Sequence, residues 1–320
     1  AVRPPPREEE PPPEQRLAAL RQRDERRREA QTLVQALATV EPAELPALTG
    51  RILACGREAM VPLKLAELSD SFELRRRARA ISRRLRWHVV VGEELTAAFP
   101  DLVSVMAGED AGARAGRVDA VVGRPDLAPV AFLGECLADA QVYVRQRALD
   151  GLVATVMAAG RDTDRPALRR RVRPLLEALL SDADQNVRLL AIGALVRIRS
   201  VNVDRLAGML DDDSMEVRAT VLRALGFSCD PAAVEHILPL LADPQWRVRA
   251  ASLQALGELV DEDPSAELQA AVARCLDDPE VYVRDLAARL LGEWECVQQA
   301  ERVQELLRDE ALSEAAALPA

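Results

Sequence analysis

Apolar and polar positions along the chain follow the period of a helix. Val248 is followed four, seven and eight positions later by Ser252, Ala255 and Leu256. The same offsets recur from three other valines: Val187, Val217 and Val283. Residues with this spacing share one face of a helix, and small residues at two of the places let helix axes approach closely. The pattern therefore predicts a series of helices that each bury one face.

A polar motif stands at the start of each of these helices. An acidic residue is followed, three to five positions later, by an apolar residue and then arginine, as in Asp243, Val248 and Arg249. The acids of the motif are Asp70, Asp110, Asp139, Asp184, Asp213, Asp243 and Asp278, and the arginines are Arg75, Arg114, Arg145, Arg188, Arg218, Arg249 and Arg284. Successive arginines are separated by 30 to 43 residues, a period typical of stacked helical hairpins. We therefore predict an all-α fold, an α-solenoid of about seven stacked hairpins.

Two stretches resemble the HEAT-repeat family, particularly its short bacterial type. They are Leu-Ala-Asp-Pro-Gln-Trp-Arg-Val-Arg-Ala-Ala-Ser-Leu-Gln-Ala-Leu-Gly from Leu241 to Gly257, and Leu-Asp-Asp-Pro-Glu-Val-Tyr-Val-Arg from Leu276 to Arg284. The resemblance covers residues 61–310 and departs from the pattern at Arg117, where a small apolar core residue is expected. It implies an α-solenoid in which repeated aspartates and arginines form a ladder between neighbouring repeats.

The motif residues have a structural interpretation. An aspartate before a helix can cap it, and an arginine where two repeats meet can pair with the acid of the next unit. We expect this ladder role for five arginines: Arg145, Arg188, Arg218, Arg249 and Arg284. Three glycines that follow helical patterns are predicted to end helices with positive φ: Gly226, Gly257 and Gly292.

The two ends differ in composition from the repeats. Residues 1–13 contain six of the 20 prolines and are predicted to be disordered. Residues 14–60 are expected to form a charged helix that caps the array, followed by a connecting helix. The solenoid then spans residues 61–310, and the alanine-rich tail 311–320 should fray.

Charge is unevenly distributed along the chain. Residues 1–100 hold 18 basic and 15 acidic residues, whereas residues 201–320 hold 10 basic and 24 acidic ones. Within the basic part, a predicted helix over residues 72–89 places four arginines opposite its apolar stripe: Arg76, Arg79, Arg83 and Arg86. Such a stripe can bind an anionic partner. The alternative is a charged surface that pairs with acids of the N-terminal helix, such as Glu25 and Glu29.

Aromatic residues are few, 3% of the chain, and four of them share one place in the motif. They precede its apolar residue by one or two positions: Phe72, Tyr143, Trp246 and Tyr282. These rings either pack across neighbouring turns or, if exposed, serve as anchors for a partner. The concave face should carry the residues two, three and six positions beyond the apolar residue, among them Gln146, Arg147, Asp150, Leu189, Leu190, Arg223, Gln254, Leu286 and Arg289.

The sequence offers little to catalysis or metal binding. Neither of its two histidines, His88 and His236, stands in a spacing typical of metal ligands. We predict no catalytic residue, no metal and no organic cofactor, and the chain holds no apolar run long enough to span a membrane. Five widely spaced cysteines, an odd number, favour a reducing compartment and hence the cytoplasm. Export followed by removal of a signal peptide is the alternative.

These observations favour a non-catalytic protein-interaction scaffold or adaptor. It would bind another protein, whose identity the sequence does not supply, through its concave face or its charged ends. The residues predicted to contact the partner are Arg76, Arg79, Arg83, Arg86, Tyr143, Trp246 and Tyr282. The alternative is a HEAT-like protein that binds nucleic acid, with a glycosylase-like enzyme as its catalytic form.

Overall fold

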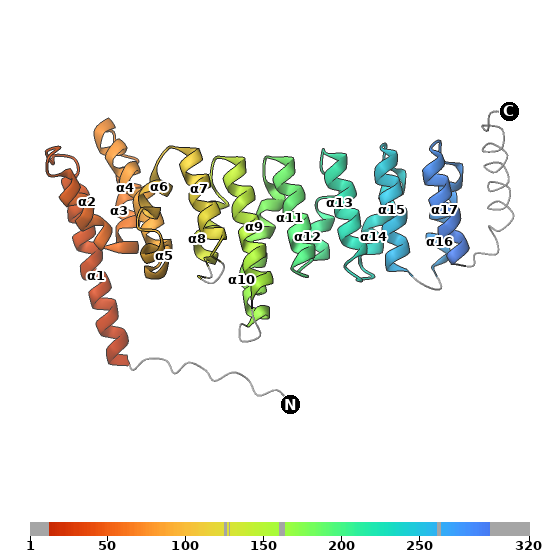
Figure 1. Ribbon diagram of the computed structural model, residues 1–320, viewed down its shortest axis with the longest axis horizontal. Helices are drawn as coiled ribbons and strands as arrows, with labels where there is room; N and C mark the ends of the chain where they lie inside the picture. The colour runs from red at the N-terminus through yellow and green to blue at the C-terminus, as the bar shows by residue number, and fades with distance from the viewer. Residues whose placement is uncertain (1–12, 125–126, 128, 160–163, 261–263, 295–320) are drawn as a thin grey trace. The chain divides into compact units, whose positions relative to one another are not determined.

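All regular structure in the described residues is helical. The computed structural model describes residues 13–124, 127, 129–159, 164–260 and 264–294. The chain forms two compact units, Ala1–Glu135 and Cys136–Ala320, and within each unit the helices stand side by side (Figure 1). The prediction of an all-α solenoid is confirmed. The predicted disorder before Pro13 and the frayed tail 311–320 lie outside the described residues, and the boundaries at residues 60 and 310 stay predictions.

The first unit contains helix pairs in which a short helix precedes a longer one. Helix α3 packs on α4, and α6 packs on α7. The elements are α1 (Pro13–Ala36), α2 (Leu45–Ala54), the 3₁₀ helix η1 (Gly56–Ala59), α3 (Met60–Ala66), α4 (Phe72–Val90), α5 (Glu93–Ala98), α6 (Leu102–Ala107), α7 (Ala111–Val122) and α8 (Val130–Cys136), which reaches the boundary.

Helix α1 covers the first unit with its last turns only. Ala30, Leu33, Val34 and Leu37 are buried, and α1 contacts α2, α3 and η1. Residues 15–29 are exposed, and they include Leu17 and Leu20, 51% and 56% exposed. The predicted N-terminal helix is present, but the first half of this helix does not cover the end of the first unit.

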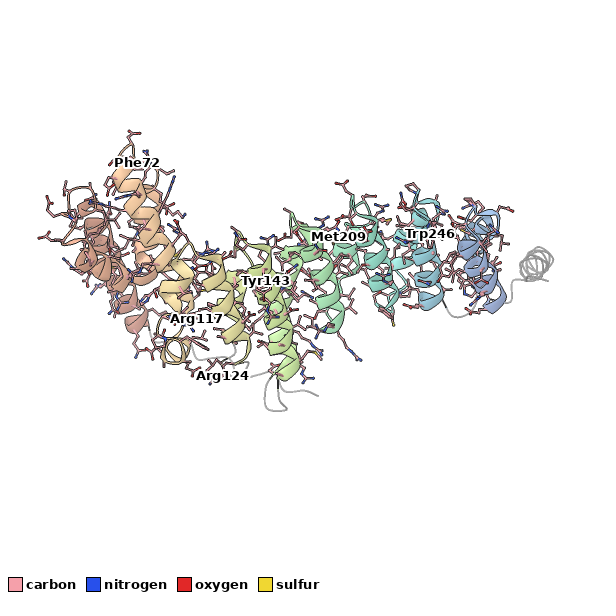
Figure 2. The ribbon with its side chains drawn as sticks, turned by 45° about the horizontal axis from the view of Figure 1, so that its top comes forward. Phe72, Arg117, Arg124, Tyr143, Met209 and Trp246 are labelled. Atoms are coloured by element: carbon pink, nitrogen blue, oxygen red, sulfur yellow. The ribbon has the colours of Figure 1, made fainter. Side chains whose placement is uncertain are left out.

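Arg117 on α7 stands where the repeat pattern has a small apolar core residue, but it does not disturb the core. Its guanidinium pairs with the carboxylate of Asp101, and the side chain stays partly exposed (Figure 2). Val118 and Val121 fill the buried positions instead.

The second unit repeats the same pairing more regularly. Helices α10, α12, α14 and α16 pack on α11, α13, α15 and α17 respectively. The elements are α9 (Val142–Ala158), α10 (Arg165–Ala178), η3 (Leu179–Ser181), α11 (Gln185–Arg197), α12 (Val203–Ala207), α13 (Met215–Gly226), α14 (Ala233–Ile237), η4 (Leu238–Ala242), α15 (Trp246–Leu259), α16 (Ala266–Arg274), η5 (Cys275–Asp277) and α17 (Val281–Glu293). The four valines that defined the helical offsets are fully buried.

A ladder of ion pairs joins successive repeats of the second unit. The Nε and Nη2 atoms of Arg218 donate to the two carboxylate oxygens of Asp243 over 2.9 and 3.1 Å. Only 12% and 5% of these two side chains is exposed. The same two-bond contact joins Arg188 to Asp212 and Arg249 to Asp278.

The first rung of this ladder differs from the other three. Arg145 pairs with Asp182 through Nη2 alone, over 2.7 Å, and its buried Nε has no hydrogen-bond partner. For Arg284, any acid supplied by a following repeat lies outside the described residues.

Each ladder arginine also binds the turn before its own helix. Nη1 of Arg218 donates to the carbonyl oxygen of Asp212, six residues earlier, over 2.7 Å. The identical six-residue contact is made by Arg75, Arg114, Arg145, Arg188, Arg249 and Arg284. The arginine therefore ties its own turn to the turn of the next repeat.

The constant six-residue spacing corrects two acids of the sequence motif. The ladder uses Asp182 and Asp212, whereas the motif had assigned Asp184 and Asp213. Asp184 instead caps α11, where it accepts hydrogen bonds from two backbone amides. The motif allowed three to five residues between the acid and the apolar residue, and this loose spacing did not separate Asp182 from Asp184 or Asp212 from Asp213. The exact six-residue spacing to the arginine does separate them.

Two of the ladder carboxylates, Asp212 and Asp278, have lowered pKa values. Burial raises the pKa of Asp278, but hydrogen bonds from Arg249 and from the amide of Glu280 outweigh that effect, and the pKa lies below its usual value. Asp212 shows the same balance, with Arg188 and the amide of Ser214 as donors.

The three glycines do not end helices with positive φ, as had been predicted. Gly226, Gly257 and Gly292 lie within helices, and among glycines of the described residues only Gly56 has a positive φ. A Cβ on Gly226 would lie 3.1 Å from Cα of Ala255, and one on Gly257 would lie 3.2 Å from Cδ1 of Leu290. These two glycines permit close helix packing.

We expect Arg249→Ala to reduce the free energy of unfolding by about 2 to 4 kcal/mol, because it leaves the buried Asp278 carboxylate unpaired. Arg289→Ala is the control, since Arg289 forms an exposed pair with Asp285 worth about 1 kcal/mol or less. Urea unfolding followed by circular dichroism measures both. Equal losses in the two variants would contradict the structural role of the ladder.

Stability should also depend on pH through Asp278. Because its folded-state pKa is lowered, the pair stabilises the fold above the ordinary carboxyl pKa of about 3.9 and loses that contribution as pH falls below it. The difference in unfolding free energy between the wild type and Asp278→Asn should therefore shrink between pH 6 and pH 3. A difference that stays constant over this range would show that the carboxylate charge contributes nothing.

Gly226→Ala and Gly292→Ala should have opposite effects on thermal stability. The new methyl at position 226 meets the backbone of α15, and such overpacking costs about 1 to 3 kcal/mol. At position 292 no atom of the described residues lies within 4 Å, so the higher helix propensity of alanine should stabilise by up to about 1 kcal/mol. Melting temperatures that fall equally in both would contradict the packing explanation.

Candidate functional site

A groove of about 430 Å³ lies across the second helices of successive repeats in the second unit. Helices α13 and α15 supply most of its lining, and α11 and α17 supply one residue each. The lining residues are Leu189, Met215, Glu216, Ala219, Thr220, Arg223, Trp246, Arg247, Ala250, Ala251, Gln254 and Tyr282.

The position of the groove follows from the helical repeat. Val217 and Val248 point into the core with no exposed surface, so residues two and six positions later point away from the core, and the residue three positions later lies at the edge of the buried face. At those offsets stand Ala219, Thr220 and Arg223 on α13, and Ala250, Ala251 and Gln254 on α15. The alanines keep the floor of the groove low, and the longer side chains form its walls.

Two aromatic rings from neighbouring repeats meet at one end of the groove. The rings of Trp246 and Tyr282 lie 6.0 Å apart between centroids at 78°, an edge-to-face contact. The guanidinium of Arg247 lies 5.3 Å from the centre of the Trp246 ring, and Nε2 of Gln254 donates to the Tyr282 hydroxyl over 3.2 Å. The rings are held in place by these contacts while 37% of Trp246 and 45% of Tyr282 stays exposed.

The groove carries charges of both signs. Arg223 and Arg247 line it together with Glu216, whose carboxylate accepts a hydrogen bond from the Ser214 hydroxyl over 2.9 Å. The backbone amide of Glu216 itself, followed by Ser214, lowers the pKa of this carboxyl. The groove therefore combines aromatic surface with a few fixed charges.

The other two aromatic residues of the motif lie elsewhere. Tyr143 is exposed but does not line the groove, and Figure 2 shows it apart from Trp246 within the second unit. Phe72 is exposed at the start of α4 in the first unit. The structure therefore joins Trp246 with Tyr282 and leaves Tyr143 outside the groove.

The four arginines predicted as one stripe on α4 divide into two groups. Arg79, Arg83 and Arg86 line a pocket of the first unit. Arg76 does not line it, and pairs over 2.8 Å with Glu73 on its own helix.

The acids that lie beside these arginines also differ from Glu25 and Glu29 of the N-terminal helix, which were the partners expected in the alternative interpretation. Arg83 meets Glu109 over 3.5 Å, and Arg86 pairs with Glu135. Glu29 instead lies 3.9 Å from Arg51. The carboxylates come from α4 itself and from segments after it, because α1 packs on the side of α2, α3 and η1.

Sequence reasoning missed several residues of the groove. Met215, Glu216 and Arg247 stand one or two positions before a buried valine, the place at which only aromatic residues had been noticed. Their position one or two residues before the buried valine could have identified them, because residues of any type at that position lie near the groove.

No group of three or more metal-ligating side chains gathers within the part of the chain that the structure describes. His88 and His236 are both exposed. Of the described helices, none combines the length and apolar character that crossing a membrane requires.

Comparisons with known proteins identify the repeats. Residues 172–257 and 203–275 match the family described as HEAT repeats. A search of curated proteins finds no match to this sequence.

Solved structures similar to the chain include engineered proteins. One engineered protein is 17% identical with a TM-score of 0.43, covering 90% of this chain and 84% of that one. A designed armadillo repeat protein is 16% identical with a TM-score of 0.42, covering 61% of this chain and 98% of that one. Both TM-scores are low, so the fold assignment rests on the helices of the chain and on the match to HEAT repeats.

Proposed function

Since residues 172–275 match the HEAT-repeat family, we propose that the protein is a non-catalytic interaction scaffold that binds a partner protein in the groove of its second unit. The observation that carries this proposal is the exposed edge-to-face pair of Trp246 and Tyr282. Two rings from successive repeats stand over a floor of alanines, with an arginine against one of them.

This arrangement has the composition of a protein-binding hot spot. Tryptophan, tyrosine and arginine dominate the binding energy of protein interfaces, because they bury a large area at a small entropic cost. Trp246 and Tyr282 are already held by each other, by Arg247 and by Gln254. Side chains ordered before binding lose less freedom when a partner arrives, which favours affinity.

The charges of the groove limit the kind of partner. Arg223 and Arg247 face it together with a single acid, Glu216. The groove therefore suits a partner segment with two kinds of side chain. One is an apolar side chain beside the two rings, and the other is a carboxylate near Arg223 or Arg247. Cys55 and Cys275 are buried and form no disulfide, and this supports a reducing compartment such as the cytoplasm.

Replacing both rings, in the variant Trp246→Ala with Tyr282→Ala, should weaken partner binding at least tenfold, since hot-spot aromatics each contribute about 2 kcal/mol or more. The partner is first isolated from the native cell extract on immobilised wild-type protein and identified by mass spectrometry. Its affinity for each variant is then measured by isothermal titration calorimetry. The melting temperature should change little, because both rings are half exposed.

Phe227→Ala is the matched control. Phe227 is an exposed aromatic residue of the second unit that does not line the groove, so its loss should leave affinity unchanged. If the partner binds the double ring variant as tightly as the wild type, the groove is not its site.

A further inference from the structure

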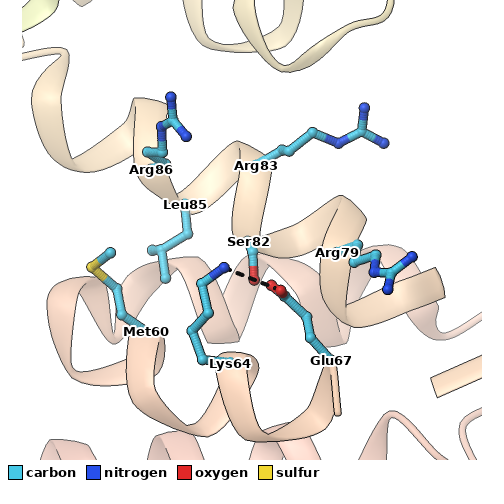
Figure 3. A pocket seen from close by; sticks show the side chains of 8 residues that line it. All are labelled: Met60, Lys64, Glu67, Arg79, Ser82, Arg83, Leu85 and Arg86. Carbon is cyan, nitrogen blue, oxygen red and sulfur yellow. Dashed lines mark hydrogen bonds and ion pairs between the residues drawn. The ribbon is translucent and has the colours of Figure 1, made fainter. Parts of the chain in front are cut away.

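A second pocket, in the first unit, collects cations from two helices. It has a volume of about 310 Å³ and lies between α3 and α4 (Figure 3). The lining residues are Met60, Lys64 and Glu67 on the side of α3, and Arg79, Ser82, Arg83, Leu85 and Arg86 on α4. This pocket is independent of the groove in the second unit and of the function proposed for it.

The spacing of the lining residues explains why the charges converge. Arg79, Arg83 and Arg86 stand at positions i, i+4 and i+7 of α4, and therefore share one face of that helix. Across the pocket, Met60 and Lys64 are also four residues apart on α3. Because α3 and α4 pack on each other, these two faces border the same space. Lys64 is the only lysine of the chain.

The cations of the pocket exceed its acids. Lys64 is paired with Glu67 over 3.1 Å (Figure 3), and Arg86 is paired with Glu135, which leaves Arg79 and Arg83 on α4. Arg83 meets Glu109 over 3.5 Å, and the side chain of Glu109 is 87% exposed. An exposed pair of this kind contributes about 1 kcal/mol or less, so a carboxylate from a ligand can replace Glu109 at small cost.

The pocket also contains apolar surface. Leu85 is buried, whereas Met60 is exposed at the mouth of the pocket. A polyanionic phosphate backbone has no apolar group to set against these side chains. An acidic protein segment can supply both kinds of group. Carboxylates already lie against Arg83 and Arg86, from Glu109 and Glu135, and show that this chemistry fits.

We propose that the pocket between α3 and α4 binds an acidic protein segment. The segment sets carboxylates against Arg79, Arg83 and Arg86 and an apolar side chain over Met60. Its recognition combines charge with burial of one apolar group, which distinguishes it from general attraction of an anion to a basic surface.

The test uses a fluorescein-labelled peptide of four Glu-Glu-Leu repeats as the probe and measures its binding by fluorescence anisotropy. The full chain should bind it, and Arg79→Gln with Arg83→Gln should raise Kd about tenfold or more. The matched control is Arg76→Gln with Arg84→Gln. These two arginines are exposed on the same helix and do not line the pocket, so the control removes the same charge and should raise Kd less than about threefold. Circular dichroism confirms that both variants keep their helices.

Two further probes test the chemistry of the ligand. A peptide with alanine in place of leucine should bind several-fold more weakly, and a duplex DNA of about 20 base pairs should compete poorly at physiological salt. The proposal is overturned if both double variants weaken binding equally, if the alanine peptide binds as tightly as the leucine peptide, or if DNA displaces the peptide and depends on the same two arginines. Absence of peptide binding to the wild type would also overturn it.

Discussion

The contact on which the second unit depends is the arginine that bridges two turns. In four successive repeats one guanidinium binds a backbone carbonyl of its own turn and a carboxylate of the next turn, as Arg218 does with Asp212 and Asp243. The planar five-donor guanidinium can make these bonds at once, whereas an ammonium group cannot match the two-oxygen geometry. Because the carboxylate also accepts a bond from an amide two residues later, it is held from both sides. Removing either partner would leave the other charge partly buried and unpaired, so the joint between repeats depends on both.

This ladder also positions the candidate binding site. Asp243 lies three residues before Trp246, and Asp278 lies four residues before Tyr282. The arginines of α13 and α15 therefore fix the two turns that carry the aromatic pair. The rings come from different repeats, so their 6.0 Å contact depends on how one repeat is set against the next. Stability and the proposed function thus rest on the same joints.

Much of the fold could be predicted because helical packing leaves a regular pattern in the sequence. The offsets from Val248 predicted the buried face of α15, and the repeated arginines predicted where repeats meet. Two ladder acids were assigned wrongly because the loose spacing to the apolar residue admitted Asp184 as well as Asp182, and only the exact six-residue spacing to the arginine separates them. Gly226 was misread for a related reason. A glycine near a helix end is compatible with positive φ and with close packing, and only the neighbouring helix decides between them.

The site was predictable in part. The offsets that define the groove face followed from the helical period, and Trp246 and Tyr282 were recognised by their place in the motif. Tyr143 holds the same place, but the groove forms between α13 and α15, two repeats away. The stripe on α4 divided because Arg79, Arg83 and Arg86 face α3, whereas Arg76 stands one turn nearer the start of the helix. These outcomes depend on how deeply a side chain is buried and on which elements lie beside it. The spacing of residues along a single helix contains neither kind of information.

A double-mutant cycle on Arg218 and Asp243 tests the central role of the ladder most directly. Unfolding free energies are measured for the wild type, Arg218→Ala, Asp243→Ala and the double variant, and the interaction energy is taken from the difference. The account predicts a coupling of more than about 1 kcal/mol, since the two side chains are buried together and joined by two hydrogen bonds. A coupling near zero, with the two single losses simply adding, would show that the repeats are held together by their apolar faces alone.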